Sequence, residues 1–115
     1  MACCDEKLEK IDIKWHDKKS LCIVLCSKGY PDVFEKNVLI KDLHNIKLNK
    51  DEYCYHAGTK ISKQNIYAIG GRVLNFVCLS DDFNKSRKKI FEIINSLNWK
   101  DGFFRKDIGY KVINK

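Results

Sequence analysis

The chain has 115 residues, a formal net charge of +7 and a charged fraction of 32%. These values fit one globular domain and exclude a wholly disordered chain. No apolar stretch is long enough to span a bilayer, and the first residues carry no secretion signal, so we expect a cytoplasmic protein. Its lysines are scattered over every segment. This is typical of a solvated surface, whereas a dense basic patch would indicate a nucleic-acid binder.

The six cysteines raise the question of a disulfide scaffold. Cys22, Cys26, Cys54 and Cys78 lie in apolar, strand-like runs, where a free thiol behaves as a small hydrophobic side chain. Without an export signal we expect all thiols to be reduced. There is no Cys-x-x-Cys pair, and Cys22 and Cys26 would lie roughly 13 Å apart on one strand face. We therefore predict no metal ligands in this chain.

The first part of the chain changes character several times. Residues 1–10 look like the end of a helix, and "IDIKWHD" (11–17) alternates apolar and polar residues like a half-exposed strand. The run "SLCIVLCS" (20–27) is continuously apolar, which is typical of a strand buried on both faces. The turn "KGYPD" (28–32) ends this strand because glycine and proline disfavour its continuation. The mixed residues 33–52 predict loop and short strand.

The clearest unit is a hairpin formed by "EYCYHAGTKI" (52–61) and "NIYAIGGRVLNFVCLS" (65–80). Its tip lacks the usual Gly or Asn, so a four-residue loop is expected around Lys63 and Gln64. Pairing that is symmetric about the tip predicts five further pairs: Ile61 with Ile66, Thr59 with Ala68, Ala57 with Gly70, His56 with Gly71, and Tyr55 with Arg72. Both glycine turns would then lie at one level, where missing side chains let another backbone or a ligand approach.

Residues 81–99 predict one long amphipathic helix. Asp82 can cap its first turn, and Asn98 and Gly102 stand where it should stop. Its apolar stripe consists of Phe83, Ile90, Ile94 and Leu97, widened by Phe91 and Ile93. The segment "GFFRKDIGY" (102–110) closes the fold. Together these elements predict an α+β fold, a mostly antiparallel sheet with the helix packed on it.

One group of residues could bind an anion. Gly70, Gly71 and Arg72 can present backbone N–H groups and a guanidinium, whose planar fork suits phosphate. Lys28 at a glycine turn and the basic pair at 105–106 add positive charge. Alternatively, each glycine serves a turn and each arginine pairs with a surface carboxylate. Both interpretations stay open because the sequence does not show that these residues converge.

Catalysis by a nucleophile has one candidate. His56 shares a strand face with Cys54, but no carboxylate is placed to orient its ring. We therefore expect His56 to be a structural or ligand-contacting residue, and we assign no catalytic residue.

The ordered motifs "SKGYP", "YHAGTK", "GGRVL" and "FFRKDIGY" resemble the C-terminal domain of the phosphoribosylamine–glycine ligases, over residues 20 to about 110. The resemblance implies a rudiment-hybrid-like fold for residues 20–115, and it makes residues 1–19 the tail of an upstream ATP-grasp portion. In this family, ATP and Mg²⁺ convert glycine to an acyl phosphate in de novo purine biosynthesis. The amine of 5-phosphoribosylamine then attacks it to give glycinamide ribonucleotide.

The resemblance also implies roles for single residues. Gly70, Gly71 and Arg72 would contact the substrate phosphate, and a second group would line or brace the same wall: Lys28, Tyr30 and His56. Matching the family's "RKDIG" motif, Arg105, Lys106 and Asp107 would be substrate contacts or interdomain ties. The sequence departs from the family pattern at Ile69, which replaces an asparagine beside the anion site. It departs as well at Asp32, at Asn37 and at the hairpin tip, where family members carry glycine.

The family's ATP loop and Mg²⁺ carboxylates belong to the upstream portion. We therefore expect this chain to be inactive alone and to complete the substrate cleft of that portion, whether joined to it or separate. Such a domain should expose an apolar patch where its partner packs. Two alternatives are a free-standing binding module for a phosphorylated metabolite and a basic nucleic-acid binder with stacking aromatics. We expect neither nucleic acid nor membrane as a partner.

Overall fold

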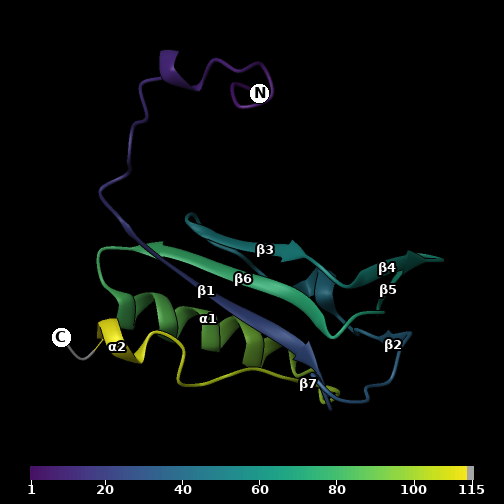
Figure 1. The fold of residues 1–115 in the computed structure, drawn as a ribbon. Coiled ribbons are helices and arrows are strands. Elements are labelled where there is room, and N and C mark those ends of the chain that lie inside the picture. Colours follow the sequence, from purple (N-terminus) through teal and green to yellow (C-terminus); the bar gives the residue numbers. More distant parts are fainter. Residues whose placement is uncertain (114–115) are drawn as a thin grey trace.

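The structure, a computed structural model, describes residues 1–113 and contains two antiparallel sheets (Figure 1). The main sheet has the strand order β3-β6-β1-β7, and the small sheet has the order β2-β5-β4. The strands are β1 (Lys19–Ser27), β2 (Val38–Leu39), β3 (Glu52–His56), β4 (Thr59–Ser62), β5 (Asn65–Ala68), β6 (Arg72–Ser80) and β7 (Gly102–Phe103). The helices are α1 (Phe83–Leu97) and the short α2 (Tyr110–Ile113). This arrangement confirms the predicted α+β fold.

Helix α1 covers one face of the main sheet (Figure 1). Its first turn is capped by Asp82, whose carboxylate accepts a hydrogen bond from the Lys85 backbone N–H at 3.0 Å. The helix ends at Asn98, which takes the left-handed conformation. Its buried residues are Ser86, Ile90, Ile93, Ile94 and Leu97. The buried residues of the sheet include Leu21, Ile23, Leu25, Leu74, Phe76 and Cys78. Burial of each large side chain here contributes about 1.5–3 kcal/mol, so this layer holds the fold together.

The opposite face of the main sheet is covered by no helix within residues 1–113, and we call it the open face. Strand pairing assigns to it Cys22, Val24, Cys26, Tyr53, Tyr55, Arg72, Asn75, Val77 and Phe103. The expectation that β1 is buried on both faces is therefore wrong at Cys22, which is exposed. The physical reason is that one helix can cover only one side of the sheet.

The hairpin tip is tighter than expected. Ser62 pairs with Asn65, so the loop contains only Lys63 and Gln64. Both residues have positive φ angles, 45° and 68°, as a two-residue turn of the I′ type requires. The predicted four-residue loop is wrong, while the predicted pairs Ile61 with Ile66 and Thr59 with Ala68 are confirmed.

Beyond Thr59 the hairpin register departs from symmetry. His56 lies opposite Leu74 and Tyr55 lies opposite Asn75, so their predicted pairing with Gly71 and Arg72 is wrong. The chain leaves the main sheet after His56, forms β4 and β5 in the small sheet, and returns at Arg72. Residues 69–71 lie between the two ladders and produce the offset.

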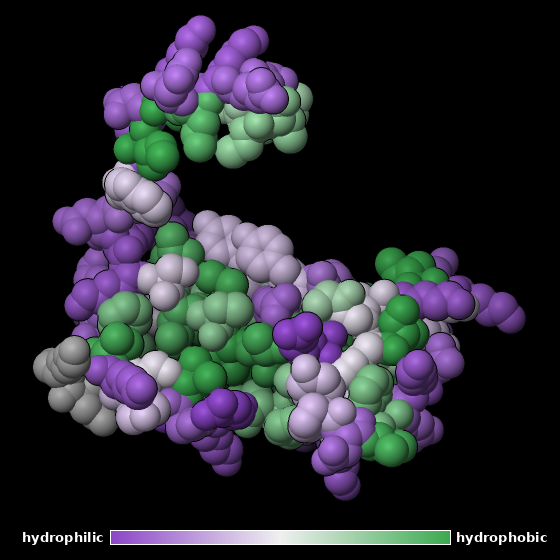
Figure 2. Space-filling model, viewed as in Figure 1, coloured by the Kyte–Doolittle hydropathy of each residue, from purple (hydrophilic) through white to green (hydrophobic). Residues whose placement is uncertain are grey.

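Residues 1–18 form an extended N-terminal arm that stands clear of the body (Figures 1 and 2). The arm contains one 3-10 turn, Leu8–Lys10, instead of the expected helix end, and it has no strand at 11–17. A short segment that buries no apolar face lacks the packing that stabilises a helix or strand. The arm joins the body next to an ion pair, in which the Nζ of Lys18 lies 2.6 Å from Oδ2 of Asp51.

None of the helices described within residues 1–113 has the length and apolar character needed to cross a membrane.

Candidate functional site

Two of the predicted glycines meet where the chain passes between the two sheets. The backbone N–H groups of Ile69 and Gly70 both donate to the Gly58 carbonyl, at 2.8 and 3.2 Å. A Cβ atom on Gly58 would lie 2.8 Å from the Gly70 Cα and 2.5 Å from the Arg72 carbonyl oxygen, too close for any side chain. Glycine is therefore required here because the chain's own backbone fills the space.

Gly71, which follows Gly70 in the "GGR" segment, lies under the ring of Tyr30. A Cβ atom at Gly71 would lie only 2.1 Å from the Tyr30 Cδ2 atom. The contact is reinforced by Ser27, whose hydroxyl donates to the Gly70 carbonyl at 2.9 Å and whose N–H donates to the Gly71 carbonyl at 2.8 Å. The structure thus brings the "SKGYP" turn against the "GGR" segment, two motifs that are far apart in sequence.

Arg72 and His56 occupy opposite faces of the main sheet. Arg72 pairs with Cys26 on the open face. Burial raises the pKa of the Cys26 thiol, and the positive charge of Arg72 offsets part of this rise. His56 pairs with the buried Leu74 and so belongs to the helix-covered face. Its Nδ1 lies 2.8 Å from the Thr59 hydroxyl across the Gly58 turn. The structure does not bring His56 to Arg72.

The three charged residues at 105–107 do not form one cluster. Arg105 makes two hydrogen bonds to Asp107, from Nε to Oδ1 at 3.1 Å and from Nη2 to Oδ2 at 2.6 Å. This pairing lowers the pKa of the Asp107 carboxyl and raises that of the Arg105 guanidinium. Both side chains are largely exposed, so the pair stabilises the fold little. Lys106 instead lines a separate cavity beside α1.

The open face carries an apolar groove of about 300 Å³. It is lined by Cys22, Val24, Cys26, Tyr30, Pro31, Phe103, Arg105 and Ile108. Two predicted site residues, Tyr30 and Arg105, thus lie at the groove, and Arg72 stands beside Cys26 at the same level of the sheet. Our sequence interpretation expected an exposed apolar patch but did not locate it, although the two-sided apolar character of β1 was a signal for its position.

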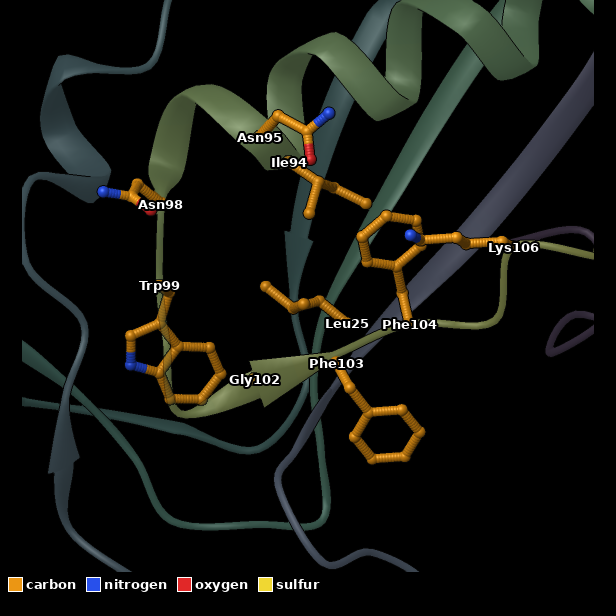
Figure 3. Close-up of a pocket in the computed structure, with 9 residues that line it drawn as sticks. All are labelled: Leu25, Ile94, Asn95, Asn98, Trp99, Gly102, Phe103, Phe104 and Lys106. Carbon is orange, nitrogen blue, oxygen red and sulfur yellow. The ribbon is translucent and has the colours of Figure 1, made fainter.

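The cavity that Lys106 lines lies between the end of α1 and β7 and has a volume of about 310 Å³ (Figure 3). Ile94, Leu25 and Phe104 project into it, whereas Phe103 points away (Figure 3). Gly102 lies against the Trp99 ring, and the Trp99 indole N–H donates to the Leu39 carbonyl at 3.1 Å. These contacts tie β7 to the rest of the fold.

Residues 1–113 contain no group of three or more His, Cys, Asp or Glu side chains that could hold a metal ion.

Residues 20–111 match the family model for the C domain of phosphoribosylglycinamide synthetase. The chain is 30% identical over 114 residues to a phosphoribosylamine–glycine ligase of Brucella melitensis, which covers 99% of this chain and 27% of the relative. It is 36% identical over 106 residues to the ligase of Fusobacterium nucleatum, covering 91% and 25% of the two chains. The chain therefore spans about a quarter of the length of these relatives.

A crystal structure of the phosphoribosylamine–glycine ligase from Thermotoga maritima has a similar fold, with a TM-score of 0.61 and 25% sequence identity. The likeness covers 76% of this chain and 21% of that one. Fold, family model and relatives agree over the same part of the chain, which thus belongs to the phosphoribosylglycinamide synthetase C-domain family.

Proposed function

We propose that this chain serves as the C-terminal domain of a phosphoribosylamine–glycine ligase in purine biosynthesis in the cytoplasm. In this proposal its open face packs on the nucleotide-binding portion of the ligase and completes the substrate cleft. Arg72, with the backbone of Gly70 and Gly71, contacts the phosphate of 5-phosphoribosylamine. Tyr30 and Lys28 form the neighbouring turn, and Arg105 with Asp107 forms the rim.

One observation carries the proposal: Arg72, Tyr30 and Arg105 lie on the same open face, next to an apolar groove. A guanidinium beside an apolar surface is well suited to hold a phosphate in a cleft that excludes water. The groove supplies the apolar area that a second domain can cover. His56 is on the other face, so in this proposal it braces the Gly58 turn and makes no contact with the substrate.

ATP and Mg²⁺ are assigned to the remaining portion of the ligase. ATP supplies the phosphoryl group that activates glycine, and we assign no step of that transfer to this chain. Its own contribution is to orient the phosphoribosyl substrate and to exclude water from the acyl phosphate. The isolated chain is accordingly expected to be inactive.

The test is complementation. The Fusobacterium nucleatum ligase, truncated to lack its matching domain, would be mixed with this chain, and glycine-dependent ADP release would be measured. We expect activity only in the mixture, with a raised KM for 5-phosphoribosylamine in the Arg72→Lys variant, because lysine keeps the charge but loses the planar fork. Lys60→Ala, in the small sheet, is the matched control and should leave the KM unchanged.

An inactive mixture whose components bind each other would contradict a catalytic role for this chain. A chain that binds phosphoribosyl compounds in calorimetry without the truncated ligase would instead favour a free-standing binding module. Equal KM values for the Arg72→Lys and Lys60→Ala mixtures would remove Arg72 from the substrate site.

A further inference from the structure

The chain has 22 lysine and arginine residues, and only those at positions 72, 87 and 105 are arginines. Arg72 and Arg105 belong to the candidate site described above. Arg87 lies on α1, which covers the other face of the main sheet, yet its guanidinium reaches the segment that carries Arg105.

The Arg87 guanidinium makes two contacts. Its Nη2 donates to the backbone carbonyl of Lys106, and its Cζ lies 5.2 Å from the centre of the Phe91 ring. Phe91 in turn packs on Phe104, with ring centroids 5.2 Å apart. A guanidinium over an aromatic face is held by electrostatic attraction as well as by packing. Arg87 is thus fixed against α1 and ties the backbone near residue 106 to this helix.

The tied carbonyl lies between the two partners of the Arg105–Asp107 pair. The chain passes here from one side of the sheet to the other, because Phe104 packs on Phe91 of the helix whereas Arg105 lines the groove of the open face. The Arg105–Asp107 pair is largely exposed and joins two residues of the same loop. It therefore does not fix the loop relative to the sheet, whereas the hydrogen bond to the Lys106 carbonyl does.

Two further observations favour a role for Arg87 beyond filling space. The hydrogen bond from Arg105 is the main cause that lowers the pKa of the Asp107 carboxyl, and the charge of Arg87 lowers it further. In addition, the Arg87 Nε is buried and has no hydrogen-bond partner among residues 1–113. A buried donor without a partner costs free energy, so an apolar side chain would fill this space more favourably.

We propose that Arg87 is a positioning residue for the candidate site: by holding the Lys106 carbonyl, it sets where the Arg105 guanidinium lies at the rim of the groove. This inference rests on the proposed function, in which Arg105 forms part of the rim of the substrate cleft. Arg87 itself lies on the helix-covered side and makes no contact with the substrate. Its effect on the site has to pass through Arg105, and this dependence can be measured.

The first measurement uses the full-length chain alone. Arg87→Met keeps an unbranched side chain over Phe91 but removes the charge and the donor to the Lys106 carbonyl. We expect the Arg105 Nε proton to exchange with solvent at least about threefold faster in this variant, because the loop opens more often. Lys88→Met removes the same charge from an exposed neighbouring position on α1 and should leave the exchange rate unchanged. An unchanged rate in Arg87→Met overturns the inference.

The second measurement uses the mixture with the truncated Fusobacterium nucleatum ligase. Arg87→Met and Arg105→Met should each raise the KM for 5-phosphoribosylamine about three- to tenfold and change kcat less than about twofold, because they weaken substrate binding. If Arg87 acts through Arg105, the double variant should have the KM of Arg105→Met alone, whereas independent effects would multiply. Lys88→Met should keep the KM of the unmodified chain. Arg87→Lys keeps the charge and should raise the KM less than Arg87→Met, and it replaces that variant in both measurements if Arg87→Met does not fold.

The outcomes separate this inference from the proposed function. Effects of Arg87→Met and Arg105→Met that multiply would overturn the inference, since Arg87 would then act by another route. An unchanged KM in Arg105→Met would also overturn it, while the proposed function would stand if Arg72→Lys still raises the KM. An inactive mixture of the unmodified proteins would contradict the proposed function and with it the role of Arg87 in the site, whereas the exchange measurement decides separately whether Arg87 holds the loop.

Discussion

The two faces of the main sheet are made from the same strands but meet different surroundings. Along β1, Leu21, Ile23 and Leu25 are buried beneath α1, while Cys22 and Val24 face the open side. Both sets are apolar, yet only the first is covered within residues 1–113. Helix α1 therefore accounts for only one of the two apolar sets of β1. The open face is the surface on which we propose that the rest of the ligase packs.

The two faces should differ most in how far the truncation of one side chain lowers the free energy of unfolding. Ile23→Ala removes methyl groups from a side chain that is 1% exposed and should lower the free energy of unfolding by about 2–5 kcal/mol. Val24→Ala, the next residue on the opposite face, should cost less than about 1 kcal/mol in the isolated chain. Urea denaturation of both variants measures the contrast. Equal losses would mean that the open face is covered after all.

An intermediate loss of stability is expected where the turn that carries Tyr30 packs on Gly71. Gly71→Ala would drive a methyl group into the Tyr30 ring and should destabilise the chain by about 1–3 kcal/mol. Because Tyr30 is the group in the way, adding Tyr30→Ala should recover part of that loss, so the double variant should be less destabilised than the sum of the single ones. Strict additivity in denaturant unfolding would show that the two residues do not touch.

The smallest expected effect is on the pH dependence of stability, and it comes from Cys54 in the edge strand β3. Burial raises the pKa of the Cys54 thiol to about 11, above its ordinary value of 9.0. Since the folded pKa is the higher one, the contribution of the neutral thiol is complete below about pH 9 and is lost as pH rises toward 11. The loss should be small because Cys54 is only half-buried.

Denaturation at pH 8 and at pH 10.5 tests this point. Cys54→Ala should lose less stability between the two pH values than the unmodified chain does. Cys3→Ala, which changes an exposed cysteine in the arm, serves as the control and should behave like the unmodified chain. Identical losses in all three proteins would contradict a buried neutral thiol at position 54.

The sequence predicted the elements that local signals determine. The Asp82 cap, the apolar stripe of α1 and the pairs nearest the hairpin tip depend on residues close together in the chain, and the structure confirms them. The register beyond Thr59 was not predictable in this way. It depends on how closely Gly58 approaches Gly70, which is a contact between the two connections that join the sheets and leaves no periodic pattern in the sequence.

The same contrast between local signals and long-range contacts applies to the candidate site. The sequence predicted Arg72, Tyr30 and Arg105 as candidate site residues, and strand pairing and the groove put all three on one face. The prediction that His56 lies beside Arg72 depends on a symmetric hairpin, and the structure has His56 opposite Leu74 instead. The arm was misjudged for another reason: alternation at 11–17 shows that a strand is possible, but not that a pairing edge is within reach.

The start of β6 has a consequence for how related chains can vary. The register between β1 and β6 shifts between Leu25 and Cys26, so that Leu25 pairs with Leu74 whereas Cys26 pairs with Arg72. This irregularity puts the guanidinium on the open face although Leu74, two residues later, is buried on the other face. A related chain that lacked the extra residue would have to carry its basic side chain one position away to keep it on the same side.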